Sequence, residues 1–181
     1  MKHFWLLLLL SSASAFGQLP ANMYGDSAHA PFYYGVTSGD PLHNQVIIWT
    51  KIESGASSET VDWELSVAPD FSYVNASGSV TTDASKDFTV KVDVTGLNPS
   101  TLYYYRFKDS AGNVSTTGRT RTTPQSFDVI SHMRFAVASC SSIYSGFFNA
   151  YGRIGERTDI DFIMHLGDYI YDFVDADEEV R

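Results

Sequence analysis

Alternation of apolar and polar residues, with no helical period between the alternating runs, is the feature that most constrains the fold of residues 32–123. Val61–Val67 and Phe88–Val94 place apolar side chains at every second position, the period of a half-buried strand. Gln45–Thr50 and Leu102–Phe107 are further runs rich in β-branched and aromatic residues. Strands at this spacing predict an antiparallel β-sandwich.

Turn sequences separate these runs. Ser38–Pro41 precedes one strand and Ser110–Asn113 follows another. Leu97–Pro99 followed by Tyr103 resembles the tyrosine corner of fibronectin type III and Ig-like sandwiches, in which the tyrosine hydroxyl bonds to upstream backbone. We therefore expect a fibronectin III/Ig-like all-β sandwich in which Tyr103 has a structural role.

The pattern changes after a linker at residues 124–132. Arg134–Ser139 and Asp161–Leu166 are compact apolar runs of the kind found in fully buried strands of parallel sheets. Residues 147–157, between them, carry apolar side chains at helical spacing. Strand, helix and strand within residues 133–181 predict one βαβ unit, the start of an α/β domain that this stretch is too short to complete.

Residues 1–15 have the order of an export signal. Lys2 supplies a short basic region, Phe4–Leu10 an apolar block, and Ala13–Ala15 a small-residue cleavage site. The apolar block is well short of the roughly 20 residues of a transmembrane helix. We therefore expect an exported protein, periplasmic or extracellular, with no transmembrane anchor.

The composition excludes several kinds of partner and site. The 181 residues include 12 Lys and Arg against 21 Asp and Glu, a formal net charge of −9, which argues against a nucleic-acid-binding surface. A single cysteine excludes an intrachain disulfide and metal sites built from several cysteines. We expect a monomer.

Two polar residues directly follow the two predicted parallel strands. Cys140 follows the first and Asp168 the second, and neighbouring strands lie about 4.8 Å apart, so both side chains can meet at one sheet edge. A thiolate beside a carboxylate suits a transition metal. Tyr171 lies three residues further on, and a phenolate ligand calls for a hard, highly charged ion such as Fe(III).

Each of these residues also has a structural interpretation when it is taken alone. A free cysteine is often part of a core, Gly167-Asp168 is an ordinary strand-ending turn, and Tyr171 suits an aromatic core. His165 lies inside a strand, and we expect a hydrogen-bonded core histidine there rather than a ligand. The acidic residues of the C-terminal tail are expected to form a solvated face: Asp172, Asp175, Asp177, Glu178 and Glu179.

Four segments together resemble the PhoD-like phosphatase (alkaline phosphatase D) family. Phe32–Pro41 and Val46–Thr50 are similar to the entry to the family's N-terminal sandwich. Arg134–Cys140 and His165–Tyr171 are similar to its first two metal motifs. The resemblance implies an exported hydrolase of phosphate mono- and diesters that has a calcineurin-like metallophosphoesterase domain. It also implies that this chain is the N-terminal portion of such an enzyme.

The resemblance also implies a set of ligands. Cys140 and Tyr171 would bind iron (Fe3+), and Asp168 would bridge that iron to calcium (Ca2+). Such cations hold phosphoryl oxygens and activate an attacking water. The leader has no twin arginine, which leaves the export route open, and the chain lacks the family's later Asn-His and His/Asp motifs. We therefore expect the 181-residue chain alone to bind metal weakly and to be inactive.

A second hypothesis comes from a different functional class. The chain could be a secreted, fibronectin III-like binding module without catalysis. The two hypotheses differ over Cys140, Asp168 and Tyr171, which a pure binding module has no reason to keep together. Iron and calcium content therefore distinguishes them.

Overall fold

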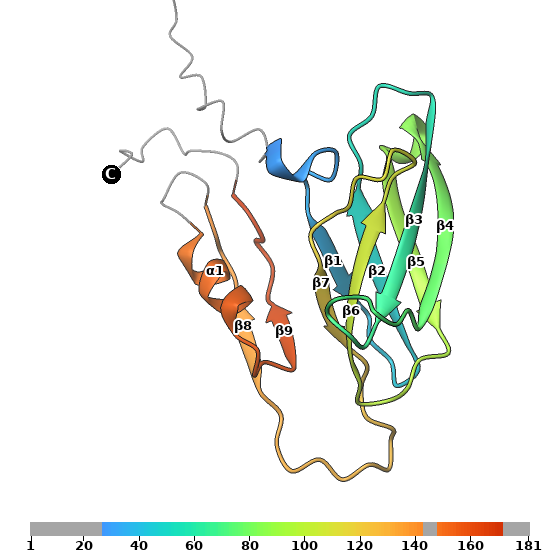
Figure 1. Ribbon diagram of the computed structural model, residues 1–181. Helices are drawn as coiled ribbons and strands as arrows, with labels where there is room; N and C mark the ends of the chain where they lie inside the picture. The colour runs from blue at the N-terminus through green and yellow to red at the C-terminus, as the bar shows by residue number, and fades with distance from the viewer. Residues whose placement is uncertain (1–26, 143–147, 172–181) are drawn as a thin grey trace, which may run out of the picture.

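A computed structural model describes residues 27–142 and 148–171 of the chain. The export signal predicted for residues 1–15 and the acidic face predicted after Tyr171 lie outside the described residues. Figure 1 shows a larger, all-β part and, beside it, a smaller part built from two strands and a helix. No helix in the described ranges has the length and hydropathy of a membrane span.

The larger part consists of two antiparallel sheets, one with strand order β1-β2-β5 and the other with order β4-β3-β6-β7. Two short 3-10 helices, η2 and η3, accompany the strands. The bounds are η2 Ser27–His29, β1 Val36–Gly39, β2 Gln45–Lys51, β3 Ser58–Ser66, β4 Ala76–Asp83, η3 Ala84–Lys86, β5 Thr89–Thr95, β6 Leu102–Lys108 and β7 Gly118–Arg121.

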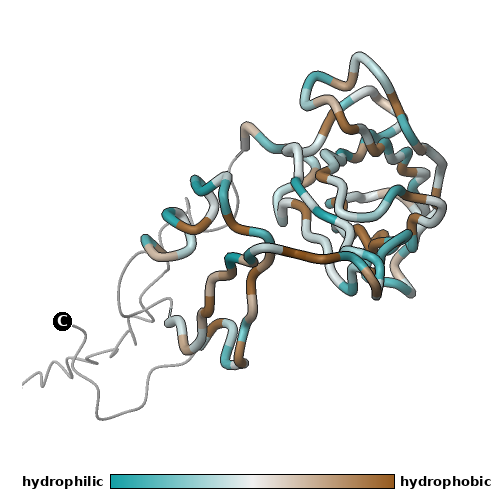
Figure 2. Tube along the Cα trace, turned by 90° about the horizontal axis from the view of Figure 1, so that it is seen from below, coloured by the Kyte–Doolittle hydropathy of each residue, from teal (hydrophilic) through white to brown (hydrophobic). Residues whose placement is uncertain are grey.

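The two sheets enclose a single hydrophobic core. Along β2 and β6 every second residue is buried, and all of these buried residues except Thr50 carry an apolar or aromatic side chain. Figure 2 shows hydrophobic positions distributed along the strands. The alternation read from the sequence therefore produces the antiparallel sandwich that it predicts. The core residues are Phe32, Val46, Ile48, Ile52, Val61, Leu65, Val90, Val94, Leu97, Tyr103, Tyr105 and Phe107.

Tyr103 fixes the turn that leads from β5 into β6. Its buried hydroxyl accepts a hydrogen bond of 2.9 Å from the backbone N–H of Asn98. The carbonyl of Asn98 in turn accepts a hydrogen bond of 2.6 Å from the Thr122 hydroxyl, next to the end of β7. The structural role predicted for Tyr103 is confirmed.

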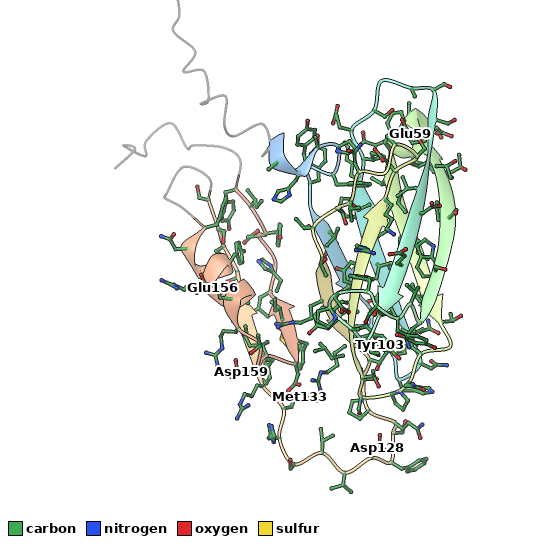
Figure 3. All side chains as sticks on the ribbon, viewed as in Figure 1. Glu59, Tyr103, Asp128, Met133, Glu156 and Asp159 are labelled. Atoms are coloured by element: carbon green, nitrogen blue, oxygen red, sulfur yellow. The ribbon has the colours of Figure 1, made fainter. Side chains whose placement is uncertain are left out.

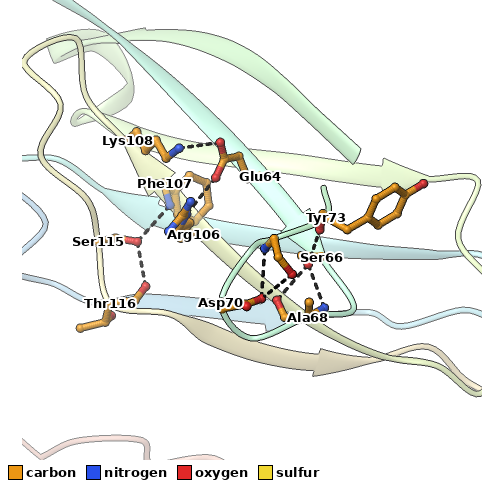
Figure 4. A network of polar contacts seen from close by, with 11 residues as sticks. Glu64, Ser66, Ala68, Asp70, Tyr73, Arg106, Phe107, Lys108, Ser115 and Thr116 are labelled. Carbon is orange, nitrogen blue, oxygen red and sulfur yellow. Dashed lines mark hydrogen bonds and ion pairs between the residues drawn. The ribbon is translucent and has the colours of Figure 1, made fainter. Parts of the chain in front are cut away.

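Charged side chains occupy the outer face of the second sheet (Figure 4). Glu64 on β3 accepts hydrogen bonds from Arg106 at 2.8 Å and Lys108 at 2.5 Å, both on the neighbouring strand β6. Burial raises the pKa of Glu64, but the hydrogen bonds from Lys108 and Arg106 outweigh it and hold that pKa below its ordinary value. The Arg106 guanidinium also lies 3.9 Å from the centre of the Phe71 ring.

Sequence pattern does not indicate three of the strands, β1, β4 and β7. The largest difference is in β1, which runs through Ser38 and Gly39, where the sequence indicates a turn. These residues pair with Ile48 and Ile47 of β2, so the hydrogen-bonding groups of the neighbouring strand override the local turn preference.

The smaller part consists of β8 (Phe135–Ala138), α1 (Asn149–Glu156) and β9 (Phe162–His165). The two strands pair in parallel, as the predicted strand–helix–strand unit requires. At their start the rings of Phe135 and Phe162 stack with centroids 5.1 Å apart. Figure 3 shows Met133 just before β8, Glu156 at the end of α1 and Asp159 in the turn before β9.

The prediction that both parallel strands are fully buried is wrong for the described chain. Phe135 and Val137 of β8 are each 52% exposed, and Ile163 of β9 is 56% exposed. Neither strand contains a buried residue, and α1 contains none either. The physical reason is that a two-stranded sheet with one helix, as described here, provides too few layers to enclose its apolar side chains.

Two side chains of β7 connect the sandwich to the smaller part. Arg121 forms an ion pair of 3.7 Å with Asp161, and Arg119 donates a hydrogen bond to the backbone carbonyl of Arg157. Asp161 is fixed on its other side by the backbone N–H of Arg134, at 2.9 Å. A cavity of about 1070 Å³ lies between the two parts and is lined by residues of both.

Candidate metal centre

The segments that follow β8 and β9 continue side by side beyond the strand ends. The backbone N–H of Ser141 points to the carbonyl of Asp168 at 3.3 Å, and that of Tyr171 donates to the carbonyl of Ser141 at 2.7 Å. A parallel bridge between Ser142 and Tyr171 extends the pairing. Cys140 and Asp168 therefore lie at the same edge, at the carboxyl ends of two neighbouring parallel strands.

The structure brings the three predicted ligands together. The Cys140 sulfur lies 3.7 Å from Oδ2 of Asp168, and the Tyr171 hydroxyl lies 3.8 Å from the same sulfur. Two donor atoms on one transition-metal ion lie about 3 to 4 Å apart, because each sits about 2.0 to 2.3 Å from the ion. This spacing fits one shared ion, and the role of the three residues as ligands stays a prediction.

Two of these residues have an unusual backbone conformation. Cys140 has φ +58° and Asp168 has φ +50°, next to Gly167 at φ +107°. The left-handed region costs non-glycine residues about 1 to 2 kcal/mol each. Five other non-glycine residues of the described chain, all in the sandwich part, share this conformation, so it shows a backbone that its surroundings hold in place and does not by itself mark the site. Both side chains are also exposed and therefore accessible to an incoming ion.

The electrostatics of the site favour a neutral phenol in the metal-free chain. Hydrogen bonds with Asp168 and with Cys140 raise the pKa of Tyr171 well above its ordinary value. A cation at the same place acts in the opposite direction, because positive charge favours thiolate, carboxylate and phenolate. The donor set is therefore one that a highly charged ion would convert into three anionic ligands.

The described residues supply only part of a metal centre. Within residues 27–142 and 148–171, His, Cys, Asp and Glu side chains form no group of three that could hold an ion. The third donor here is the phenol of Tyr171. Protein-bound metal ions usually have four or more ligands, so three donors leave positions open. The cavity between the two parts is a separate feature, since none of the three residues lines it.

Sequence reasoning missed Tyr151, which the helical pattern shows only as one apolar position. Its hydroxyl accepts a hydrogen bond of 2.8 Å from Ser141, the residue after Cys140, and lies 2.8 Å from Nε2 of His165. His165 is hydrogen-bonded, as predicted, but half-buried rather than in a core. A tyrosine in place of an aliphatic residue on the inner side of α1 is the signal that could have indicated this contact.

Comparison with known protein families identifies both parts of the chain. The profile of the PhoD-like phosphatase N-terminal domain matches residues 18–124, and that of PhoD-like phosphatase matches residues 135–181. The chain belongs to the PhoD-like phosphatase family. The resemblance that the sequence motifs indicate is thereby confirmed.

Two relatives show how much of a PhoD-like protein is present. Alkaline phosphatase D of Bacillus subtilis (strain 168) is 33% identical over 176 residues, which is 93% of this chain. A solved structure described as "Structure of PhoD" matches with a TM-score of 0.75 and 33% identity over 82% of this chain. In both comparisons the chain spans 30% of the relative's length.

Proposed function

We propose that this PhoD-like chain is the N-terminal portion of an exported, metal-dependent hydrolase of phosphate monoesters and diesters. The observation that carries the proposal is the meeting of Cys140, Asp168 and Tyr171 at the carboxyl edge of the β8–β9 pair. The 33% identity to an alkaline phosphatase D supports a phosphate ester as substrate.

In this proposal Cys140 and Tyr171 bind Fe3+, and Asp168 bridges that ion to Ca2+. The bridging role suits a carboxylate, whose two oxygens can contact two cations. When bound, the cations would offset the charge of the phosphoryl oxygens and lower the pKa of a bound water. A chain of net charge −9 needs such compensation to admit an anionic substrate.

We also propose the arrangement in which the site works. Residues 133–181 begin a calcineurin-like α/β domain, residues 32–123 form a fibronectin III-like sandwich, and residues 124–132 link them. The exposed apolar side chains of β8 and β9 support this, since further layers of an α/β domain would cover them. Residues 1–15 direct export, and the mature protein is a monomer.

The first experiment compares the 181-residue chain with a longer protein that carries it together with the remaining ligand motifs. We expect the longer protein to release p-nitrophenol from p-nitrophenyl phosphate, and a chelator to stop this reversibly. We expect no turnover by the 181-residue chain. Chelator-resistant activity of the longer protein would contradict metal dependence. Turnover by the 181-residue chain would contradict the proposal that the later ligand motifs are needed to complete the metal centre.

The second experiment tests the ligands in the longer protein. Cys140→Ala, Asp168→Asn and Tyr171→Phe should each lower activity by more than about 100-fold, since loss of a group that only supports a ligand already costs about 10- to 100-fold. Asp93→Asn and Tyr73→Phe, on the sandwich, should stay within about twofold of the original. A protein that holds no iron or calcium, and ligand variants that behave like these controls, would favour the non-catalytic binding module.

A further inference from the structure

One hydroxyl on α1 joins the two segments that carry the candidate ligands. Oη of Tyr151 accepts a hydrogen bond of 2.8 Å from Oγ of Ser141, in the segment after β8. The same oxygen lies 2.8 Å from Nε2 of His165, the last residue of β9, and 3.4 Å from the carbonyl oxygen of Tyr169, in the segment after β9. The helix between the strands thus connects both ligand-bearing segments.

The contacts define the direction of each hydrogen bond. The backbone N–H of Gly167 donates to Nδ1 of His165 at 3.2 Å, so that nitrogen carries no proton. The neutral imidazole then carries its proton on Nε2 and donates it to Tyr151. With Ser141 as a second donor, the Tyr151 hydroxyl directs its own proton to the carbonyl of Tyr169. All donors and acceptors are satisfied in one arrangement.

Aromatic packing holds the hydroxyl at this position. The Tyr151 ring stacks on Phe148 and on Tyr169, in each case with centroids 5.9 Å apart. His165 meets the Tyr169 ring edge-on, with centroids 4.9 Å apart. Rigid rings with few torsions lose little entropy when they are fixed. This cluster therefore orders the segments although β8, α1 and β9 contain no buried residue.

We propose that Tyr151, together with His165, is a positioning residue that keeps Cys140 and Asp168 facing each other. The left-handed backbone of both candidate ligands is unfavourable, so neighbouring contacts must hold it in place. Ser141 and Gly167, each adjacent to one candidate ligand, are the residues that the cluster holds. The identity of the ligands rests on the proposed function, but their positioning is a property of the metal-free chain.

The single cysteine of the sequence supplies a direct readout. A chromogenic aromatic disulfide added to the metal-free 181-residue chain can react only with the thiol of Cys140. The rate of this reaction is compared between variants at one fixed pH. Tyr151→Phe keeps the ring and deletes the hydroxyl. We expect this variant to react about tenfold faster, because the two segments open more often and the Cys140 sulfur then leaves its contact with Oδ2 of Asp168.

Tyr169→Phe is the matched control. It keeps the stacked ring and removes a hydroxyl that has no hydrogen-bond partner among the described residues. Its thiol should react within about twofold of the original chain. His165→Ala should also accelerate the reaction, and the effect of the double variant should be smaller than the product of the two single effects, because Tyr151 and His165 share one contact. His165→Gln, which keeps a donor toward Tyr151, should recover part of the protection.

Iron binding by the longer protein provides a separate readout. Tyr151→Phe should weaken iron binding by about 10- to 100-fold and shift the tyrosinate-to-iron(III) absorption, while Tyr169→Phe should not. If the original protein takes up no iron but Tyr151→Phe still accelerates the thiol reaction, the positioning role holds and the proposed metal function fails. If Tyr151→Phe reacts at the same rate as Tyr169→Phe, the positioning role is wrong whatever the iron content.

Discussion

The sandwich and the strand–helix–strand part contain strands of similar apolar content but bury them to very different extents. On β6 the side chain of Phe107 is fully buried between two sheets. On β8 the side chain of Phe135, in a run that is more continuously apolar, is 52% exposed. The comparison teaches that burial depends on how many layers surround a strand and cannot be read from the strand alone.

Different kinds of interaction also stabilise the two parts. The sandwich relies on a shared apolar core, whereas the smaller part relies on polar and aromatic contacts centred on Tyr151. Apolar burial contributes most of the free energy in a typical domain, and hydrogen bonds contribute mainly direction and specificity. We therefore expect the global stability of the chain to depend on the sandwich.

A pair of identical substitutions gives the largest contrast between the two parts. Phe107→Ala should lower the free energy of unfolding by about 3 to 5 kcal/mol, because it leaves a cavity in the core. Phe135→Ala should lower it by less than about 1 kcal/mol, because half of that side chain is already in water. Urea unfolding followed by the fluorescence of Trp49 and Trp63, both in the sandwich, measures this. Equal shifts would contradict the difference in burial.

Glycine substitutions provide a second, smaller contrast. A Cβ at Gly118 would lie 2.2 Å from the ring of buried Tyr105, so Gly118→Ala should cost about 1 to 3 kcal/mol. A Cβ at Gly152 on α1 meets nothing within 4 Å. Gly152→Ala should therefore stabilise the helix by about 0.5 to 1 kcal/mol. Urea midpoints and helical circular dichroism test the pair, and a stabilising Gly118→Ala would overturn the close packing against Tyr105.

The smallest expected effect concerns pH and the Glu64 cluster. The folded-state pKa of Glu64 is lowered, so this group stabilises the fold at pH values above its ordinary pKa of about 4.3, and the contribution is lost as the pH falls through the lower folded value. Glu64→Gln should lower the free energy of unfolding by at most about 1 kcal/mol at pH 7 and by less at pH 3. Asp159→Asn, on the exposed surface of the smaller part, should change it less at either pH. If Glu64→Gln lowered the free energy of unfolding more at pH 3 than at pH 7, the lowered pKa of Glu64 in the folded state would be contradicted.

Much of the sandwich could be predicted because its signals are local. Alternation marks β3 and β5, runs of β-branched and aromatic residues mark β2 and β6, and the spacing from Leu97 to Tyr103 indicates the turn between the sheets. β1, β4 and β7 could not be predicted, because their pairing partners decide them more than their own residues do. The exposure of β8 and β9 depends on which other layers are present, which the local sequence pattern does not record.

The candidate site could also be predicted only in part from the sequence. Cys140 and Asp168 could be placed together because carboxyl ends of adjacent parallel strands share an edge. Tyr171 contacts the same sulfur because the segment after β9 continues alongside the segment after β8, with a parallel bridge between Ser142 and Tyr171. Tyr151 escaped prediction because a tyrosine in a helical stripe shows that a hydroxyl is present but does not show which residues far along the chain it contacts.

The left-handed backbone at Cys140 and Asp168 has an evolutionary consequence. Glycine would adopt either conformation without strain, and asparagine is among the residues that tolerate it best. Aspartate tolerates this region nearly as well, so the strain falls mainly on Cys140. A lineage released from any chemical demand at Cys140 would drift toward glycine or asparagine there and would gain thermal stability as it lost the thiol.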